Sequence, residues 1–181
     1  PNRLKINIDF AVNELSVAET DVRGKMEVKW LHGAVAKNLR AHVAVTLTAG
    51  STSFEKYEDF NFYDPARGFS STEQILFDGR IDGNGLAEIV PDINVTNIAP
   101  GKLKANFVTR VFEESGDFSI DRFSIPYSPY KVYVGLKVPE GTLITDTMHK
   151  VEIVTVDHNG KPVDVEDLEV TVYKVHWRWW W

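Results

Sequence analysis

The feature that most constrains this chain is its tryptophan-dense C-terminal end. Residues 151–181 contain two strand-like runs that flank an Asn159-Gly160 turn and an acidic connector, and the second run finishes in HWRWWW. Each indole would bury on the order of 150–250 Å², so exposing the last four would forgo roughly 15–25 kcal/mol. We therefore expect this end to pack against the first domain, a second copy or further chain.

Composition excludes several classes of function. The 181 residues carry a net charge of −6 without a basic block, which argues against a nucleic-acid or anionic-membrane surface. The chain contains no cysteine, which removes disulfides, thiolate nucleophiles and cysteine-rich zinc sites. It begins at Pro1 without methionine, and we expect a fragment of a longer protein.

Period-two hydrophobicity predicts an all-β chain, because apolar and polar residues alternate where one face of a strand is buried. Turn signals separate the runs at the spacing of a β-sandwich. Gly83-Asn84-Gly85 predicts a tight hairpin turn between two of them. The predicted strands are 25–30, 42–47, 75–81, 86–90, 103–111 and 118–123.

Three stretches do not follow the period-two alternation of apolar and polar residues. Residues 34–41 and 71–74 have some helix character, but both are brief and are interpreted as loops or single turns. Residues 54–69 are aromatic and acidic with little periodicity, and are interpreted as an excursion that could hold one strand.

Pro126 and Pro129 mark a predicted domain boundary, because proline opposes both helix and central strand. We expect one complete antiparallel sandwich of the fibronectin or immunoglobulin type over residues 1–126. Three further strands, 131–138, 150–156 and 169–177, follow it. Three strands cannot close a sandwich, so residues 127–181 are predicted to be an incomplete second β domain.

No catalytic, cofactor-binding or metal-binding residue is predicted. His149 and His158 could meet with Asp146 and Asp157 as a metal site, but no pair has diagnostic spacing, and a structural or surface role is favoured for all five histidines. Adjacent acidic pairs such as Glu113 and Glu114 point to opposite faces of a strand and make poor acid–base dyads. Nucleophile-elbow and phosphate-loop patterns are missing from the sequence.

The tryptophan strand is the candidate contact surface. On a strand, Tyr173, Val175, Trp177 and Trp179 share one face, while His176, Arg178 and Trp180 share the other. Aromatic rings on a sandwich face could stack sugars, but apolar residues stand on both faces, which favours core or interdomain packing. The candidate packing residues are Trp177, Arg178, Trp179, Trp180 and Trp181.

Several runs resemble the macroglobulin-like domains of bacterial alpha-2-macroglobulins. Residues 30–39, WLHGAVAKNL, resemble the aromatic-Leu-x-Gly-x₅-Leu stretch of these domains, and 99–103 and 110–117 are similar to their late strands. Residues 130–139, 156–163 and 173–180 look like the opening of the next domain. The resemblance identifies the chain as middle domains, about the fifth and the start of the sixth.

The resemblance implies a structural shell segment of a secreted or periplasmic protease trap, without catalysis of its own. In that family a protease cuts a bait segment, the molecule rearranges, and a Cys-to-Gln thioester captures the protease. The Glu73-Gln74 pair here follows Ser71-Thr72 rather than cysteine, so the thioester cannot reside in this chain.

The expected partners follow from the same resemblance. They are the other macroglobulin-like domains of the parent chain and, through the parent, target proteases; a lipid anchor on the parent is also compatible with it. No cofactor and no nucleic acid are expected. The alternatives are a carbohydrate-binding module that uses the tryptophans, and an adhesin-type fibronectin-like repeat.

Overall fold

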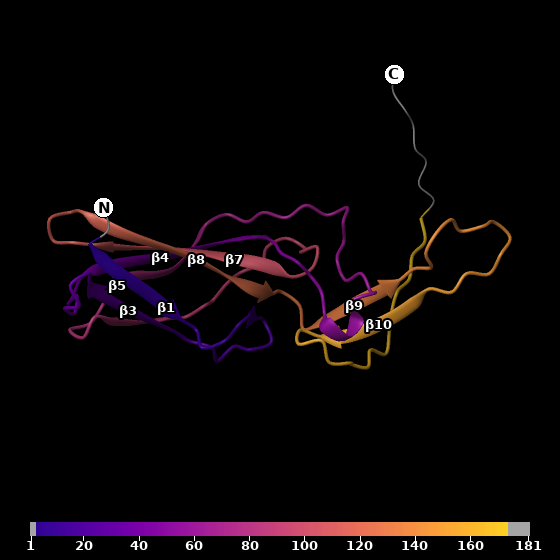
Figure 1. Cartoon of the computed structure of the whole chain (residues 1–181), viewed down its shortest axis with the longest axis horizontal. Coiled ribbons are helices and arrows are strands. Elements are labelled where there is room, and N and C mark those ends of the chain that lie inside the picture. Colours follow the sequence, from indigo (N-terminus) through magenta and orange to yellow (C-terminus); the bar gives the residue numbers. More distant parts are fainter. Residues whose placement is uncertain (1–2, 174–181) are drawn as a thin grey trace, which may run out of the picture.

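The computed structural model describes residues 3–173, which form β-strands almost throughout (Figure 1). Two sheets face each other, and a separate two-stranded sheet lies at the opposite end of the molecule from the first residues. Within the described residues the helical structure is a single 3-10 turn, η1 (Glu55–Tyr57).

The smaller sheet of the sandwich has three antiparallel strands. Its burial follows the predicted period of two, because Leu4, Ile6 and Ile8 are buried while the residues between them are exposed. In spatial order the strands are β1 (Leu4–Asp9), β3 (Gly24–Trp30) and β6 (Leu86–Ile89).

The larger sheet has five strands, antiparallel except where the short β2 runs parallel to β8. Its centre is β7, which buries one complete face, as the alternation in residues 103–111 predicts. In spatial order the strands are β2 (Leu15–Ser16), β8 (Phe118–Ser128), β7 (Leu103–Phe112), β4 (Arg40–Ala49) and β5 (Gln74–Arg80).

One hydrophobic core joins the two sheets and confirms the predicted sandwich. Phe107 of β7 is 1% exposed, stacks on Phe123 of β8 at 4.7 Å and lies 5.3 Å from Phe10. Met26 and Val28 of the smaller sheet belong to the same buried cluster. The predicted strands 25–30, 42–47, 103–111 and 118–123 are present. Of the stretches interpreted as loops or single turns, 34–41 and 71–74, residues 34–39 and 71–73 lie outside the named strands, whereas residues 40 and 41 belong to β4 and residue 74 to β5.

The predicted hairpin between residues 75–81 and 86–90 is wrong. The turn exists, but β5 pairs with β4 in the larger sheet and β6 pairs with β3 in the smaller one. Asp82 closes the turn, since its Oδ1 accepts hydrogen bonds from the amides of Asn84 and Leu86. Gly85 has φ +76°, and its carbonyl accepts a hydrogen bond from Val28 N–H, so the turn carries the chain from one sheet to the other.

The chain beyond the sandwich forms a hairpin of β9 (Val132–Lys137) and β10 (Glu152–Asp157). The predicted Asn159-Gly160 turn follows β10, with Gly160 at φ +81° and its N–H bonded to Asp157 O. Of the predicted third strand, residues 169–173 adopt no strand, and the remainder lies outside the described residues. The division of the chain at residue 126 stays a prediction.

Candidate functional site: the joint between the sandwich and the hairpin

The excursion between β4 and β5 packs against the β9–β10 hairpin, and we call this contact the joint. Its apolar part has four buried residues: Phe54 and Phe62 from the excursion, Tyr133 from β9 and Val156 from β10. The Phe54 ring lies 4.7 Å from Phe62 and 5.6 Å from Tyr133, both in edge-to-face geometry. Such pairs add about 0.5–1.5 kcal/mol to what area burial provides. The irregular excursion is therefore a packing element.

The backbone of the excursion also bonds to the hairpin. Asn61 N–H donates to Leu136 O at 2.8 Å, and Leu136 N–H donates to Asn61 O at 3.0 Å. Gly135, next to this pair, lies under Phe62, and a Cβ on it would stand 2.5 Å from the ring. A glycine is required here because the ring occupies the space of a side chain.

Lys102 is the polar centre of the joint. It lies immediately before β7, and its Nζ donates to Glu14 Oε2 at 2.6 Å and to His158 O at 2.9 Å. The ammonium also lies 4.8 Å from the centre of the Phe54 ring. Only 12% of the Lys102 side chain is exposed. One partly buried cation thus connects the start of the sandwich, the excursion and the turn after β10.

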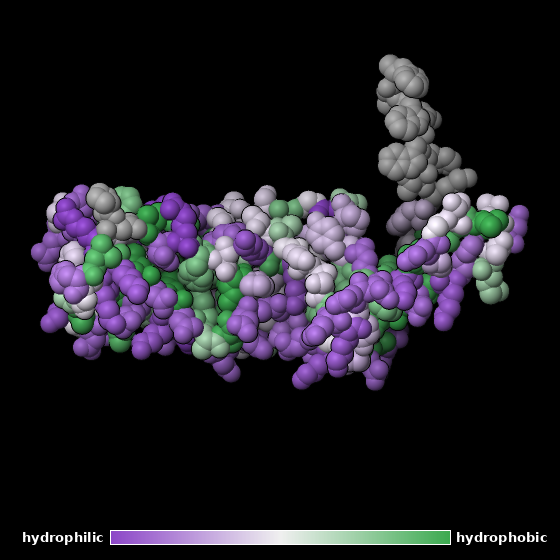
Figure 2. Space-filling model, viewed as in Figure 1, coloured by the Kyte–Doolittle hydropathy of each residue, from purple (hydrophilic) through white to green (hydrophobic). Residues whose placement is uncertain are grey.

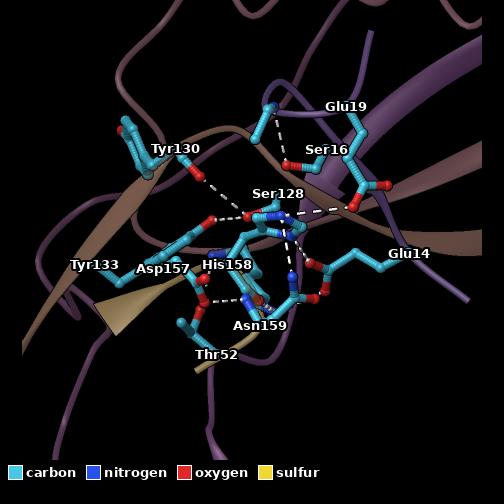
Figure 3. Close-up of polar contacts among 12 residues, drawn as sticks. Glu14, Ser16, Glu19, Thr52, Ser128, Tyr130, Tyr133, Asp157, His158 and Asn159 are labelled. Carbon is cyan, nitrogen blue, oxygen red and sulfur yellow. Dashed lines mark hydrogen bonds and ion pairs between the residues drawn. The ribbon is translucent and has the colours of Figure 1, made fainter. Parts of the chain in front are cut away.

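The His158 ring lies between two carboxylates of the sandwich (Figure 3). Its Nδ1 is 3.6 Å from Glu14 Oε1, and its Nε2 is 3.7 Å from Glu19 Oε1. Because the two nitrogens face different carboxylates, this arrangement does not converge on one ion. No cluster of histidine and acidic side chains that could hold a metal occurs among residues 3–173.

A second polar contact fixes β9 to the end of the sandwich. The Tyr133 hydroxyl lies 2.5 Å from Ser128 Oγ, the last residue of β8. Burial raises the pKa of Tyr133 to about 12, and the hydrogen bond with Ser128 offsets part of that rise. Tyr130, between β8 and β9, donates a hydrogen bond from its hydroxyl to Ala99 O at 2.8 Å. The connecting segment is thus bonded to the sandwich and is not a free linker.

Most of the residues that the sequence analysis considered as candidate sites lie apart from one another. His158 is in the joint, whereas His149 contacts Ile144 O, so the two histidines considered as metal ligands make separate contacts. His32 lies against Trp30. Glu113 forms an ion pair with Arg3 at the far end of the sandwich. The candidate packing residues Trp177, Arg178, Trp179, Trp180 and Trp181, and His176 beside them, lie outside the described residues.

Sequence reasoning missed the joint residues Phe54, Phe62, Lys102 and Glu14. The signal that was available is the aromatic density of residues 54–69, which no strand period explains. An aromatic stretch without periodicity indicates a loop that packs on something. It does not say on what, because the partner residues lie 70 or more positions further along the chain.

Two family models match the chain in succession. The Bacterial Alpha-2-macroglobulin MG5 domain matches residues 2–129, and Bacterial macroglobulin domain 6 matches residues 135–181. The first match alone covers more than half of the 181 residues. The chain belongs to the bacterial alpha-2-macroglobulin family. The joint described above therefore lies where the matches to domains 5 and 6 meet.

Solved structures give the same fold. Trypsin-activated alpha-2-macroglobulin from Escherichia coli superimposes with a TM-score of 0.50 at 19% identity over 76% of this chain. The native conformation of the E. coli protein superimposes with a TM-score of 0.51 at 17% identity over 88% of this chain. A mutant of Salmonella alpha-2-macroglobulin superimposes with a TM-score of 0.51 at 17% identity over 90% of this chain. The matched regions are 9–11% of those chains, so this chain spans about a tenth of their length. A comparison with curated proteins gives no match.

Proposed function

We propose that this chain is a structural segment of a bacterial alpha-2-macroglobulin-type inhibitor that traps proteases, without catalysis of its own. The observation that carries the proposal is the joint: the two matched domains are bonded through a buried aromatic cluster and a partly buried lysine. Such a contact suits a mechanical role, because packed side chains transmit the movement of one domain to the next.

The chemistry of the chain supports a scaffold. The Cys-to-Gln thioester implied by the resemblance needs a cysteine, and this sequence has none. The joint is filled by its own side chains, with Lys102, Glu14 and Tyr133 all engaged within the molecule. A relative from E. coli was solved in a trypsin-activated form, which supports a protease-responsive role for the parent of this chain.

The proposed partners are the neighbouring domains of the parent and the proteases that attack it, and the proposed location is the periplasm or the cell surface. Among residues 3–173 no helix is both long and apolar enough to cross a membrane.

The test uses the intact parent protein with a protease and two substrates, one small and one large. Trapping predicts that the protease keeps its activity on the small peptide and loses most activity on the large protein substrate. The 181-residue chain alone should change neither rate. Hydrolysis by the isolated chain, or a covalent adduct between it and the protease, would contradict the scaffold role.

A further inference from the structure

The side of the β9–β10 hairpin that faces away from the joint is apolar and exposed. Along β9, Tyr133 and Gly135 face the joint and are buried, while Val134 and Leu136 alternate with them and are each 43% exposed. Ile153 of β10 pairs with Leu136 and is 41% exposed. We call Val132, Val134, Leu136 and Ile153 the outer face. Figure 2 shows hydrophobic surface at this end of the molecule among the charged residues.

A two-stranded sheet is marginal in water, and its stability rests on the packing of its faces. The joint covers one face of this hairpin. The outer face carries β-branched and leucine side chains where a solvated strand would carry polar ones. We therefore expect another polypeptide segment to cover the outer face.

The family match indicates which part of the chain that is. One domain model, Bacterial macroglobulin domain 6, runs from residue 135 to residue 181 and so includes the end of β9 with Leu136, all of β10 and the tryptophan-rich end. Parts of one domain share a core. The match therefore relates the outer face to Lys174–Trp181 more directly than to any other chain.

Length and pattern agree with this assignment. Eight residues, 174–181, span up to about 26 Å when extended, whereas a six-residue strand such as β9 is about 20 Å long. With a period of two, Val175, Trp177, Trp179 and Trp181 share one wholly apolar face. The opposite face carries Lys174, His176 and Arg178, which suit solvent or the acidic surface of a chain with net charge −6, and it has one apolar residue, Trp180.

We propose that the outer face of the β9–β10 hairpin is the docking surface for the tryptophan-bearing end of this same chain, with Trp177, Trp179 and Trp181 covering Val134, Leu136 and Ile153. The contact completes the core of the second domain from within. It is independent of protease trapping, and it would hold in a scaffold of any function.

The chain has no cysteine, so pairs of introduced cysteines report proximity without background. Four double variants of the full chain combine Val134→Cys or Leu136→Cys with Trp177→Cys or Trp179→Cys. After mild oxidation, disulfides are identified by peptide mapping and gel mobility. The matched control is Ile75→Cys with Trp179→Cys, because Ile75 is also an exposed strand residue, 63% exposed, but lies in the larger sheet of the sandwich.

The proposal predicts an intramolecular disulfide in more than half of the molecules for at least one of the four pairs, and at least five times less for the control pair. Predominantly intermolecular disulfides would assign the outer face to a second copy and overturn the proposal. Equal, low yields in all five variants, with circular dichroism unchanged, would overturn it as well.

A second measurement is independent of the register. In a Trp30→Phe background all indole emission comes from the C-terminal end, and docking predicts emission shifted to the blue and protected from acrylamide. Val134→Asp should shift that emission to the red, whereas Ile75→Asp should leave it unchanged. If the Trp30→Phe variant, with its outer face unchanged, emits like indole that is free in water, docking is contradicted.

Discussion

The sandwich and the β9–β10 hairpin achieve their stability in different ways. The sandwich buries a continuous cluster contributed by both of its sheets, from Leu4 to Tyr127, and closes on itself. The hairpin has two strands, and its buried residues Tyr133 and Val156 are covered by Phe54 and Phe62 of the excursion. One region is self-sufficient, whereas the other depends on a loop of its neighbour. The difference shows how a loop without secondary structure can decide the geometry between two domains.

The largest effect is expected in the core of the sandwich. Phe107→Ala removes a ring that is 1% exposed and contacts Phe10 and Phe123. The free energy of unfolding should fall by about 3–5 kcal/mol, measured by urea denaturation followed by circular dichroism. Phe118→Ala is the matched control, because that ring is half exposed and its loss should change stability by less than about 1 kcal/mol. Equal losses would show that the core is not where the structure places it.

In the joint, Phe54→Ala should release the hairpin and leave the sandwich folded. The ring contacts Phe62 and Tyr133 and lies under the Lys102 ammonium, so the local loss is expected to be about 3 kcal/mol. Limited proteolysis should then cut within residues 132–157 much faster while the sandwich resists. A uniform increase in cleavage over the whole chain would contradict the division into a self-sufficient and a dependent region.

A substitution of the partly buried Lys102 separates the polar from the apolar contributions to the stability of the joint. Lys102→Met keeps a long apolar stem but leaves the Glu14 carboxylate and the His158 carbonyl without their donor, and should destabilise the hairpin by roughly 2–3 kcal/mol. Lys137→Met is the control, because Lys137 pairs with Asp59 in an exposed ion pair and should give no measurable change in melting temperature. Similar behaviour of the two variants would mean that the Lys102 contacts contribute no more than a surface ion pair.

The smallest effect concerns the Tyr133 hydroxyl. Tyr133→Phe removes its hydrogen bond with Ser128 and should cost about 1 kcal/mol at neutral pH. Burial raises the pKa of Tyr133 to about 12, above the value of about 10 in an unfolded chain. The folded state therefore holds the proton more tightly, and this contribution to stability is complete below pH 10 and is lost as the pH rises through 12.

Melting curves at pH 9 to 12 test whether the stability contributed by the Tyr133 hydroxyl falls as the pH rises. The wild type should lose more stability than Tyr133→Phe over that interval. A larger loss in the variant would contradict the buried position of the hydroxyl.

The sequence predicted what depends on local periodicity and missed what depends on contacts between distant segments. The alternation in residues 103–111 was enough to predict β7 and its buried face. Gly83-Asn84-Gly85 predicted the turn but not that its two strands enter different sheets, because turn chemistry is local and the pairing of β5 with β4 is not. Phe54 and Lys102 could not be assigned to the joint for the same reason, since their partners Tyr133 and His158 are 79 and 56 positions away.

The measurement that tests the central claim most directly is the distance between the sandwich and the hairpin in solution. Because the chain has no cysteine, spin labels can be attached by Lys25→Cys in β3 and Glu152→Cys in β10, both exposed positions. A joint that fixes the two regions predicts a single narrow distance distribution by pulsed electron resonance, which broadens on Phe54→Ala. A broad distribution in the otherwise unchanged chain, insensitive to Phe54→Ala, would contradict the account.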